Sequence, residues 1–305
     1  NYLLLGNAPA KFMKKSGNHA EAVRAYCEKQ FGGVGEGYVP PAIIRVFANG
    51  ADERAYRSRN NDWLAASNEV LVSEDRGYFK NAQYGQLNQR LFRQWISFKS
   101  PHLNDNMPDW IRKGLGQHMR FLKSSGKRAS HKTDPWNRDQ LRAMVKGKRQ
   151  LRLQQLLTED GGNPPVVGAV ASNVMDRAGN TGMTFDPYTL QAGSVVTWLL
   201  GKGNRGKTKG ILTEYLGYLV TATEEAANAN KARDKKADMT SLQEELKVAK
   251  SEADRQEVLQ KWQQRRAAVS QKRGEIGERA FDAVFGGYTD ADWKKLDRSW
   301  AAFAK

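Results

Sequence analysis

The 305-residue sequence contains one cysteine and no long apolar run. A single cysteine excludes an intramolecular disulfide and leaves the redox compartment open. Cys27 lies at helical spacing among apolar residues, which predicts a core thiol rather than a nucleophile. Without roughly 20 consecutive apolar residues, no transmembrane helix is expected. The first residues also lack the basic and apolar regions of a secretory signal. Because 39% of the residues are hydrophobic, the chain can form one large packed domain or two modest ones.

Histidines are few and widely separated. The four are His19, His102, His118 and His131, and no two lie three or four residues apart. The pattern H-E-x-x-H is absent, so no helix can present two imidazoles to one metal ion. His118 and His131 could still meet in space, but their spacing predicts neither a metal site nor any other cofactor site.

Acidic residues are fewer than basic residues, 33 against 49, which gives a net charge of +16. Such an excess attracts polyanions: nucleic acid, anionic lipid or glycan, or an acidic protein. The basic clusters are not interleaved with aromatic residues, and no helix-turn-helix, zinc-finger or RNP pattern occurs. We therefore expect an acidic protein partner, with a nucleic-acid-binding module as an alternative. The basic clusters lie at residues 112–132, 138–152, 202–209 and 261–273.

Two segments carry a recognisable pattern: residues 88–92, with the sequence N-Q-R-L-F, and residues 108–118, which begin P-D-W-I-R-K-G-L. Together they resemble the metal-binding helices of peptidase-MA-like (DUF1570-type) gluzincin domains. In that family, H-E-x-x-H-Q is followed some two dozen residues later by P-x-W-L-x-E-G-x-A-x-Y. The resemblance places Asn88 and Phe92 at the histidines, Gln89 at the general-base glutamate and Lys113 at the glutamate ligand. These four changes remove the zinc site, since zinc hydrolysis needs the imidazoles and the carboxylate.

The resemblance implies an α+β, zincin-like fold with a small N-terminal sheet and a mostly helical remainder. The local patterns agree with the order of elements. They predict strands over 2–5, 41–47 and 69–72 and a helix over 20–31. A closing helix near 280–286 and a tail with Trp293 and Trp300 would complete the domain. The expected boundaries are 1–222 for the zincin-like domain, 223–272 for a charged helical insertion, and 273–305 for the closing part.

The implied function is non-catalytic: a pseudopeptidase that acts as a scaffold or as a peptide- or protein-binding subunit of a larger assembly. Phe92 would fill the space of the metal, and Lys113 would supply its positive charge. The resemblance also favours an exported location. We expect the former cleft to be lined by Asn88, Gln89, Arg90, Phe92, Lys113, Gln117 and His118.

A competing motif occurs at residues 201–208, which match the phosphate-binding P-loop pattern G-x-x-x-x-G-K-[ST]. A P-loop nucleotide-binding protein is therefore a second alternative, with Gly201, Gly206, Lys207 and Thr208 as the phosphate-binding residues. It requires a strand over 194–200 and a helix from residue 208. The family resemblance instead predicts a helix over 188–200 beside the vestigial site.

Residues 223–272 are rich in charge and alanine, with apolar residues at helical spacing at Leu242, Leu246 and Val258. This pattern predicts a helical hairpin or a projecting arm, either as a solvated helix or as a surface for a partner. Asp134 before Pro135 marks a helix start. Residues 161–165 form a joint, and residues 166–174 could form a strand or a wall of the former cleft.

Overall fold

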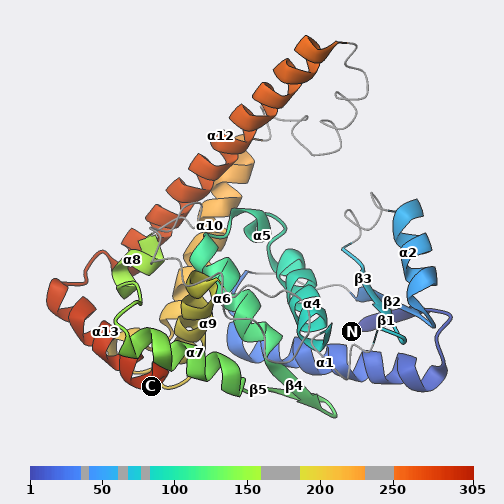
Figure 1. Ribbon diagram of the computed structural model, residues 1–305, viewed down its shortest axis with the longest axis horizontal. Helices are drawn as coiled ribbons and strands as arrows, with labels where there is room; N and C mark the ends of the chain where they lie inside the picture. The colour runs from blue at the N-terminus through green and yellow to red at the C-terminus, as the bar shows by residue number, and fades with distance from the viewer. Residues whose placement is uncertain (36–40, 61–67, 77–82, 159–185, 231–250) are drawn as a thin grey trace.

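The computed structural model describes residues 1–35, 41–60, 68–76, 83–158, 186–230 and 251–305. A small N-terminal sheet is followed by a mostly helical remainder, as predicted from the sequence (Figure 1). The segments 161–165 and 166–174, and the positions Leu242 and Leu246, lie outside the described residues.

The sheet is parallel, with the strand order β1-β2-β3. Its register pairs Leu4 with Ile44, and Ile44 with Val70. Helices α1 and α2 connect the strands, as parallel pairing requires. All three predicted strands are confirmed to within two residues. The elements are β1 (Tyr2–Gly6), α1 (Ala10–Phe31), β2 (Ala42–Phe47), α2 (Gly50–Arg59) and β3 (Val70–Ser73).

Helix α1 begins ten residues before the helix predicted from the sequence. Its first half is rich in lysine, which hides the helical pattern. Phe12, Ser16 and His19 nevertheless recur at helical spacing and are buried. Two of these three buried residues are polar, so hydrophobic periodicity alone did not reveal the helix.

Three helices form the centre of the molecule. Helix α6 packs against α4 on one side and against α9 on the other. The approach of α9 is close, because a Cβ added at Gly114 would lie 2.8 Å from the carbonyl oxygen of Ala192. The helix predicted over 188–200 is confirmed, and it packs against α6. The elements are α4 (Gln83–Lys99), α5 (Leu103–Asn106), α6 (Asp109–Arg120) and α9 (Pro187–Leu200).

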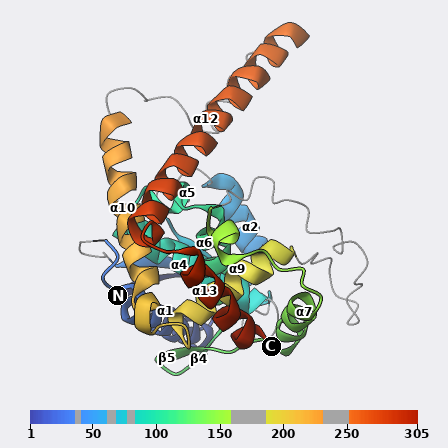
Figure 2. The same ribbon diagram turned by 90° about the vertical axis from the view of Figure 1, so that its left-hand side faces the viewer.

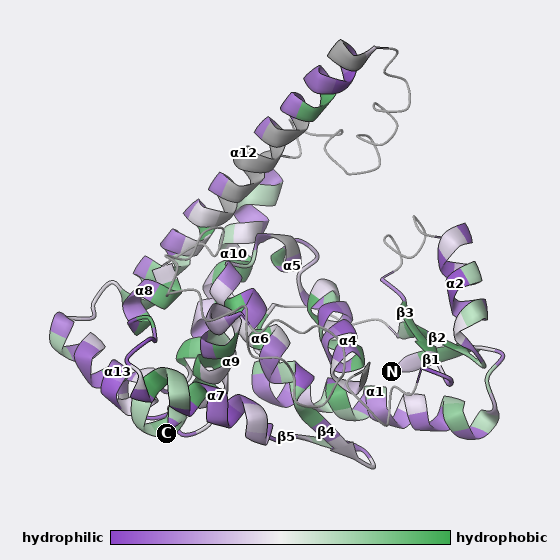
Figure 3. Cartoon of the chain, in the orientation of Figure 1, coloured by the Kyte–Doolittle hydropathy of each residue, from purple (hydrophilic) through white to green (hydrophobic). Residues whose placement is uncertain are grey.

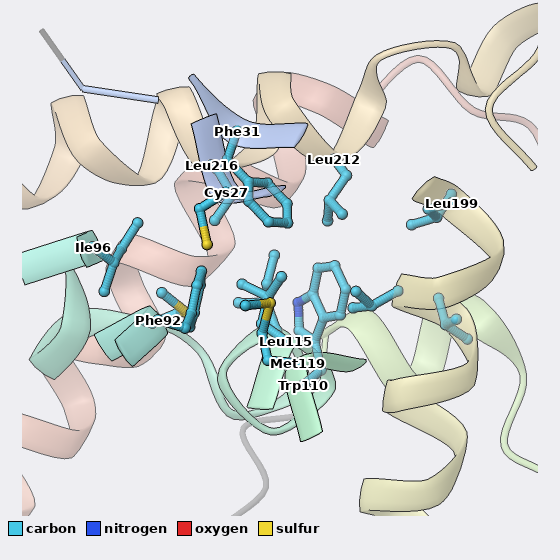
Figure 4. Close-up of a cluster of buried hydrophobic side chains, with 14 of the residues drawn as sticks. Cys27, Phe31, Phe92, Ile96, Trp110, Leu115, Met119, Leu199, Leu212 and Leu216 are labelled. Carbon is cyan, nitrogen blue, oxygen red and sulfur yellow. The ribbon is translucent and has the colours of Figure 1, made fainter. Parts of the chain in front are cut away.

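Apolar side chains from α1, α4, α6, α9 and α10 meet in one buried cluster (Figure 4). Cys27 is fully buried within it, and burial raises the pKa of its thiol, so the cysteine is a core residue as predicted. Trp110 donates a hydrogen bond from its indole nitrogen to the Tyr215 hydroxyl at 3.3 Å. The cluster ties the first half of the chain to the second.

An antiparallel hairpin and three further helices surround this centre. The hairpin was not predicted, because its strands are short and polar. Gly126, at φ +58°, lies in its turn, where a residue with a side chain would be strained. Helix α7 begins at Pro135 with the Asp134 side chain as its N-cap, as predicted. The elements are β4 (Leu122–Ser125), β5 (Arg128–His131), α7 (Pro135–Lys146), α8 (Leu153–Thr158) and α13 (Asp290–Ala304).

Helix α12 (Glu252–Phe285) projects from the body with its N-terminal part, and its C-terminal part lies beside α10 (Ile211–Asn230) (Figures 1 and 2). Hydrophilic residues predominate along the projecting part (Figure 3). Arg279 and Glu225 join the two helices by an ion pair at 2.8 Å. The closing helix predicted near 280–286 is the end of α12, so the boundary expected at residue 273 falls inside a continuous helix.

Candidate ligand-binding site

Asn88 and Phe92, at the positions of the two histidines in the family pattern, are buried in the core. The Asn88 amide donates to the Leu122 carbonyl at 2.9 Å. The Phe92 ring is 5% exposed and lies 6.0 Å from Phe31 and 6.2 Å from Trp95, measured between ring centroids. Figure 4 shows Phe92 in the same cluster as Met119 of α6. These two positions therefore contribute packing and a backbone hydrogen bond.

Gln89 and Lys113 connect helices rather than facing each other. The Gln89 amide donates to the Gly116 carbonyl at 2.8 Å, which links α4 to α6. Lys113 Nζ lies 3.4 Å from Asp186 and 3.7 Å from Asp109, and 4.9 Å from the centre of the Tyr188 ring. The two carboxylates neutralise its charge at the start of α9.

Arg90 points to the sheet, where its guanidinium donates to the Leu71 carbonyl at 3.3 Å. The residues expected in one cleft are thus divided. Asn88 and Phe92 lie in the core, Arg90 reaches β3, and Lys113 lies beside α9.

His118 is held between α1 and α9. Its Nε2 lies 2.6 Å from the Tyr26 hydroxyl, and its Nδ1 lies 2.9 Å from Thr197 Oγ1. Thr197 donates its only hydroxyl hydrogen to the Gly193 carbonyl at 2.8 Å. His118 Nδ1 must therefore donate to Thr197, while Nε2 accepts from Tyr26. Burial, together with the neighbouring His131, lowers the pKa of His118 well below 6.5, which favours this neutral form.

His131, from β5, stacks on His118 with ring centroids 4.4 Å apart and planes 4° apart. The two histidines do meet, but parallel rings do not direct nitrogens at a common ion, and both nitrogens of His118 are already hydrogen-bonded. Burial lowers the pKa of His131 to about 4. Within the described ranges, no group of three histidine, cysteine, aspartate or glutamate side chains is arranged to hold a metal ion.

A second polar cluster lies under the hairpin. His19 Nδ1 is 2.8 Å from Ser124 Oγ, and the Tyr84 hydroxyl is 2.8 Å from the same oxygen. Burial lowers the pKa of His19 to about 4. Sequence reasoning missed this cluster because its three residues come from α1, α4 and β4, with no shared motif. The cluster fastens the hairpin to the core.

The P-loop expectation is contradicted by the element before it. Residues 194–200 belong to helix α9, whereas a P-loop follows a strand. The segment forms no strand because Val195, Trp198 and Leu199 recur at helical spacing, and all three are buried. A short 3₁₀ turn, η1 (Gly206–Thr208), delays the next helix to Ile211.

The side chains of the motif are also engaged. Lys207 Nζ lies 2.9 Å from Asp292, and the Thr208 hydroxyl bonds the backbone carbonyls of Gly203 and Arg205. Gly201 caps the end of α9, and Gly206 adopts a positive φ of 57°. The four residues serve as a helix connection.

A cavity of about 250 Å³ lies among α6, α7, α9, α13 and β5. Of the residues expected to line the former cleft, Gln117 is a wall residue of this cavity. His131 and Thr197 also contribute to its wall, so the cavity adjoins the His118 hydrogen bonds. Gln117 Nε2 and Asn137 Oδ1 are buried and have no hydrogen-bond partner in the part of the chain that the structure describes.

Comparison of the chain with protein families, curated proteins and solved structures finds no match. No helix in the described ranges has the length and apolar character needed to cross a bilayer.

Proposed function

We propose that this protein is a non-catalytic binding subunit, built on a zincin-like scaffold, which binds an acidic protein partner in a larger assembly. The observation that carries the proposal is the packing of Phe92. At the position of a metal-binding histidine, its ring contributes apolar surface to a buried cluster. A hydrolytic zinc site needs ligands and an open coordination position there.

The surroundings of Phe92 support the same proposal. Gln89, at the position of the general base, is an amide that donates to a backbone carbonyl. Lys113, at the position of the third ligand, forms ion pairs with Asp109 and Asp186. Each of these side chains stabilises a contact between helices, and none supplies a base or a nucleophile.

The charge of helix α7 supports an acidic partner. Arg138, Arg142 and Lys146 recur at four-residue spacing, so they share one face, and all three are exposed. Asp139 is the only acidic residue within α7. We call these three residues the α7 basic face. Such a face attracts an acidic surface, and the attraction weakens as salt screens it.

The test uses a carboxyl-terminally amidated polyglutamate peptide as the acidic probe. We expect salt-sensitive binding that weakens at least about fivefold in the Arg142→Glu/Lys146→Glu variant, because like charges then face the probe. The matched control is Lys11→Glu/Lys14→Glu on α1, which changes the net charge equally and should bind as the parent does. Equal weakening in both variants would show only a net-charge effect and would contradict the proposal.

A DNA duplex in the same assay separates the alternative. Preferential binding of DNA over polyglutamate, with a steep dependence on salt, would favour a nucleic-acid-binding module instead.

A further inference from the structure

The cavity beside Gln117 has an apolar wall of limited size. Leu141 of α7, Leu190 of α9 and Phe303 of α13 contribute to it, together with Phe121. Its volume of about 250 Å³ lies below the range of roughly 300–1,000 Å³ that is typical of sites for drug-sized ligands. The space therefore suits one large apolar side chain rather than a nucleotide or another large cofactor.

Two polar groups of the wall have no partner within the ranges that the structure describes. Gln117 is 7% exposed and Asn137 is 6% exposed. Gln117 Nε2 is a donor and Asn137 Oδ1 is an acceptor, and neither finds a partner among the described residues. Neither atom has appreciable accessible surface, so a ligand in the cavity reaches them only when the two side chains turn toward it. A ligand amide would then accept from the first and donate to the second.

Charge at the cavity favours an anion. The exposed residues Arg138 and Lys202 both contribute to its lining. Asp134 also lines the cavity, and its carboxylate accepts from the Asn137 backbone nitrogen as the cap of α7. Arg138 lies 3.9 Å from Asp139, at the limit of an ion pair, so its guanidinium retains the capacity to bind a second carboxylate.

We propose that this cavity binds the carboxyl-terminal residue of a peptide, one with a large apolar side chain. The side chain packs against the apolar wall, and the amide group on the amino side of the last residue lies between Gln117 and Asn137. The terminal carboxylate lies near Arg138 and Lys202. The proposal deepens the proposed function, because it specifies the part of a protein partner that the cavity takes.

Calorimetry with N-acetyl-leucine and N-acetyl-phenylalanine tests the site directly. We expect at least one of them to bind, and the corresponding carboxamide, which lacks the charge, to bind about tenfold more weakly. Failure of both acids to bind, or equal binding of acid and carboxamide, would overturn the proposal.

Two variants test the individual groups. Gln117→Leu should weaken binding of the acid about tenfold, since one hydrogen bond is lost, whereas Gln154→Leu, at an exposed position of α8, should not. Arg138→Ala, at an exposed site, should weaken the acid and leave the carboxamide unchanged, which keeps the test valid if Gln117→Leu fails to fold. An Arg138→Ala variant that binds the acid as tightly as the parent would contradict the assigned carboxylate position.

The amidated polyglutamate assay separates this inference from the proposed function. Retained polyglutamate binding without binding of either acid overturns the cavity proposal alone. Loss of selective polyglutamate binding with intact binding of an acid contradicts the acidic partner and leaves the cavity proposal standing.

Discussion

The two sides of helix α6 differ in how completely they are filled. Toward α4, Met119 lies in the same buried cluster as Phe92, and Gln89 donates to the Gly116 carbonyl. Toward α7 and α9, Gln117 borders a cavity and its amide nitrogen is without a partner within the described ranges. The difference teaches that the side whose sequence resembles a metal centre stabilises the fold through packing and hydrogen bonds. The cavity, and with it the binding that we propose, lies on the opposite side of the same helix.

The filled side should respond most strongly to truncation. Phe92→Ala removes a buried ring, so we expect the free energy of unfolding to fall by about 3–5 kcal/mol. Urea denaturation measures the change. Leu259→Ala on α12 removes a side chain that is 40% exposed and serves as the control, with an expected change within about 0.5 kcal/mol. A similarly small effect at Phe92 would mean that the side toward α4 is not tightly packed.

Acid should lower the free energy of unfolding through His131, which lines the cavity and stacks on His118. Burial lowers the pKa of His131 from 6.5 to about 4, so the unfolded chain binds a proton more readily than the folded protein. The contribution of neutral His131 to the free energy of unfolding is therefore fully present above pH 6.5. It is lost as the pH falls toward 4, and the loss amounts to up to about 3 kcal/mol. Denaturant titrations across this range measure the slope. His131→Phe, which keeps a ring but cannot titrate, should show a shallower slope, and an unchanged slope would argue against His131 as its source.

Breaking the hydrogen-bond chain through His118 should lower the free energy of unfolding by less than the Phe92 truncation does. Thr197→Val leaves His118 Nδ1–H without its acceptor, which should cost about 1–3 kcal/mol of unfolding free energy. Nitrogen NMR of the imidazole should also show a neutral ring with its proton on Nδ1 in the parent protein. A protonated or Nε2–H ring at neutral pH would disprove the deduced hydrogen-bond directions.

Lys113 should matter least to stability. Its ion pair with Asp186 is partly exposed, and such pairs contribute about 0–1 kcal/mol. Lys113→Met should therefore lower the unfolding free energy by no more than this amount. A much larger loss would indicate that the ammonium supports the core.

Hydrophobic patterning was sufficient to predict much of the fold. The apolar strands near Leu4, Ile44 and Val70 and the helix start at Asp134 were all visible as local signals. The hairpin at 122–131 was not, because its polar strands are held by distant residues such as Tyr84 and His19. Local sequence carries no signal for such contacts.

The candidate site was predictable only in part. Gln117 was expected in the former cleft from the family resemblance, and it borders a cavity beside α7 and α9. Asn137, Arg138 and Phe303 were missed, since the cavity is assembled from segments between residues 117 and 304. The side of α6 on which a cavity opens depends on packing that no motif encodes.

We propose that the positions aligned with the metal ligands of the family pattern do not bind metal. Elemental analysis of the purified protein, after incubation with excess zinc and removal of the unbound ion, tests it most directly. We predict far less than one zinc atom per chain, because Phe92 and Asn88 are buried in packing and hydrogen-bonding roles. One tightly bound zinc per chain, lost in an Asn88→Ala variant that remains folded, would contradict the claim.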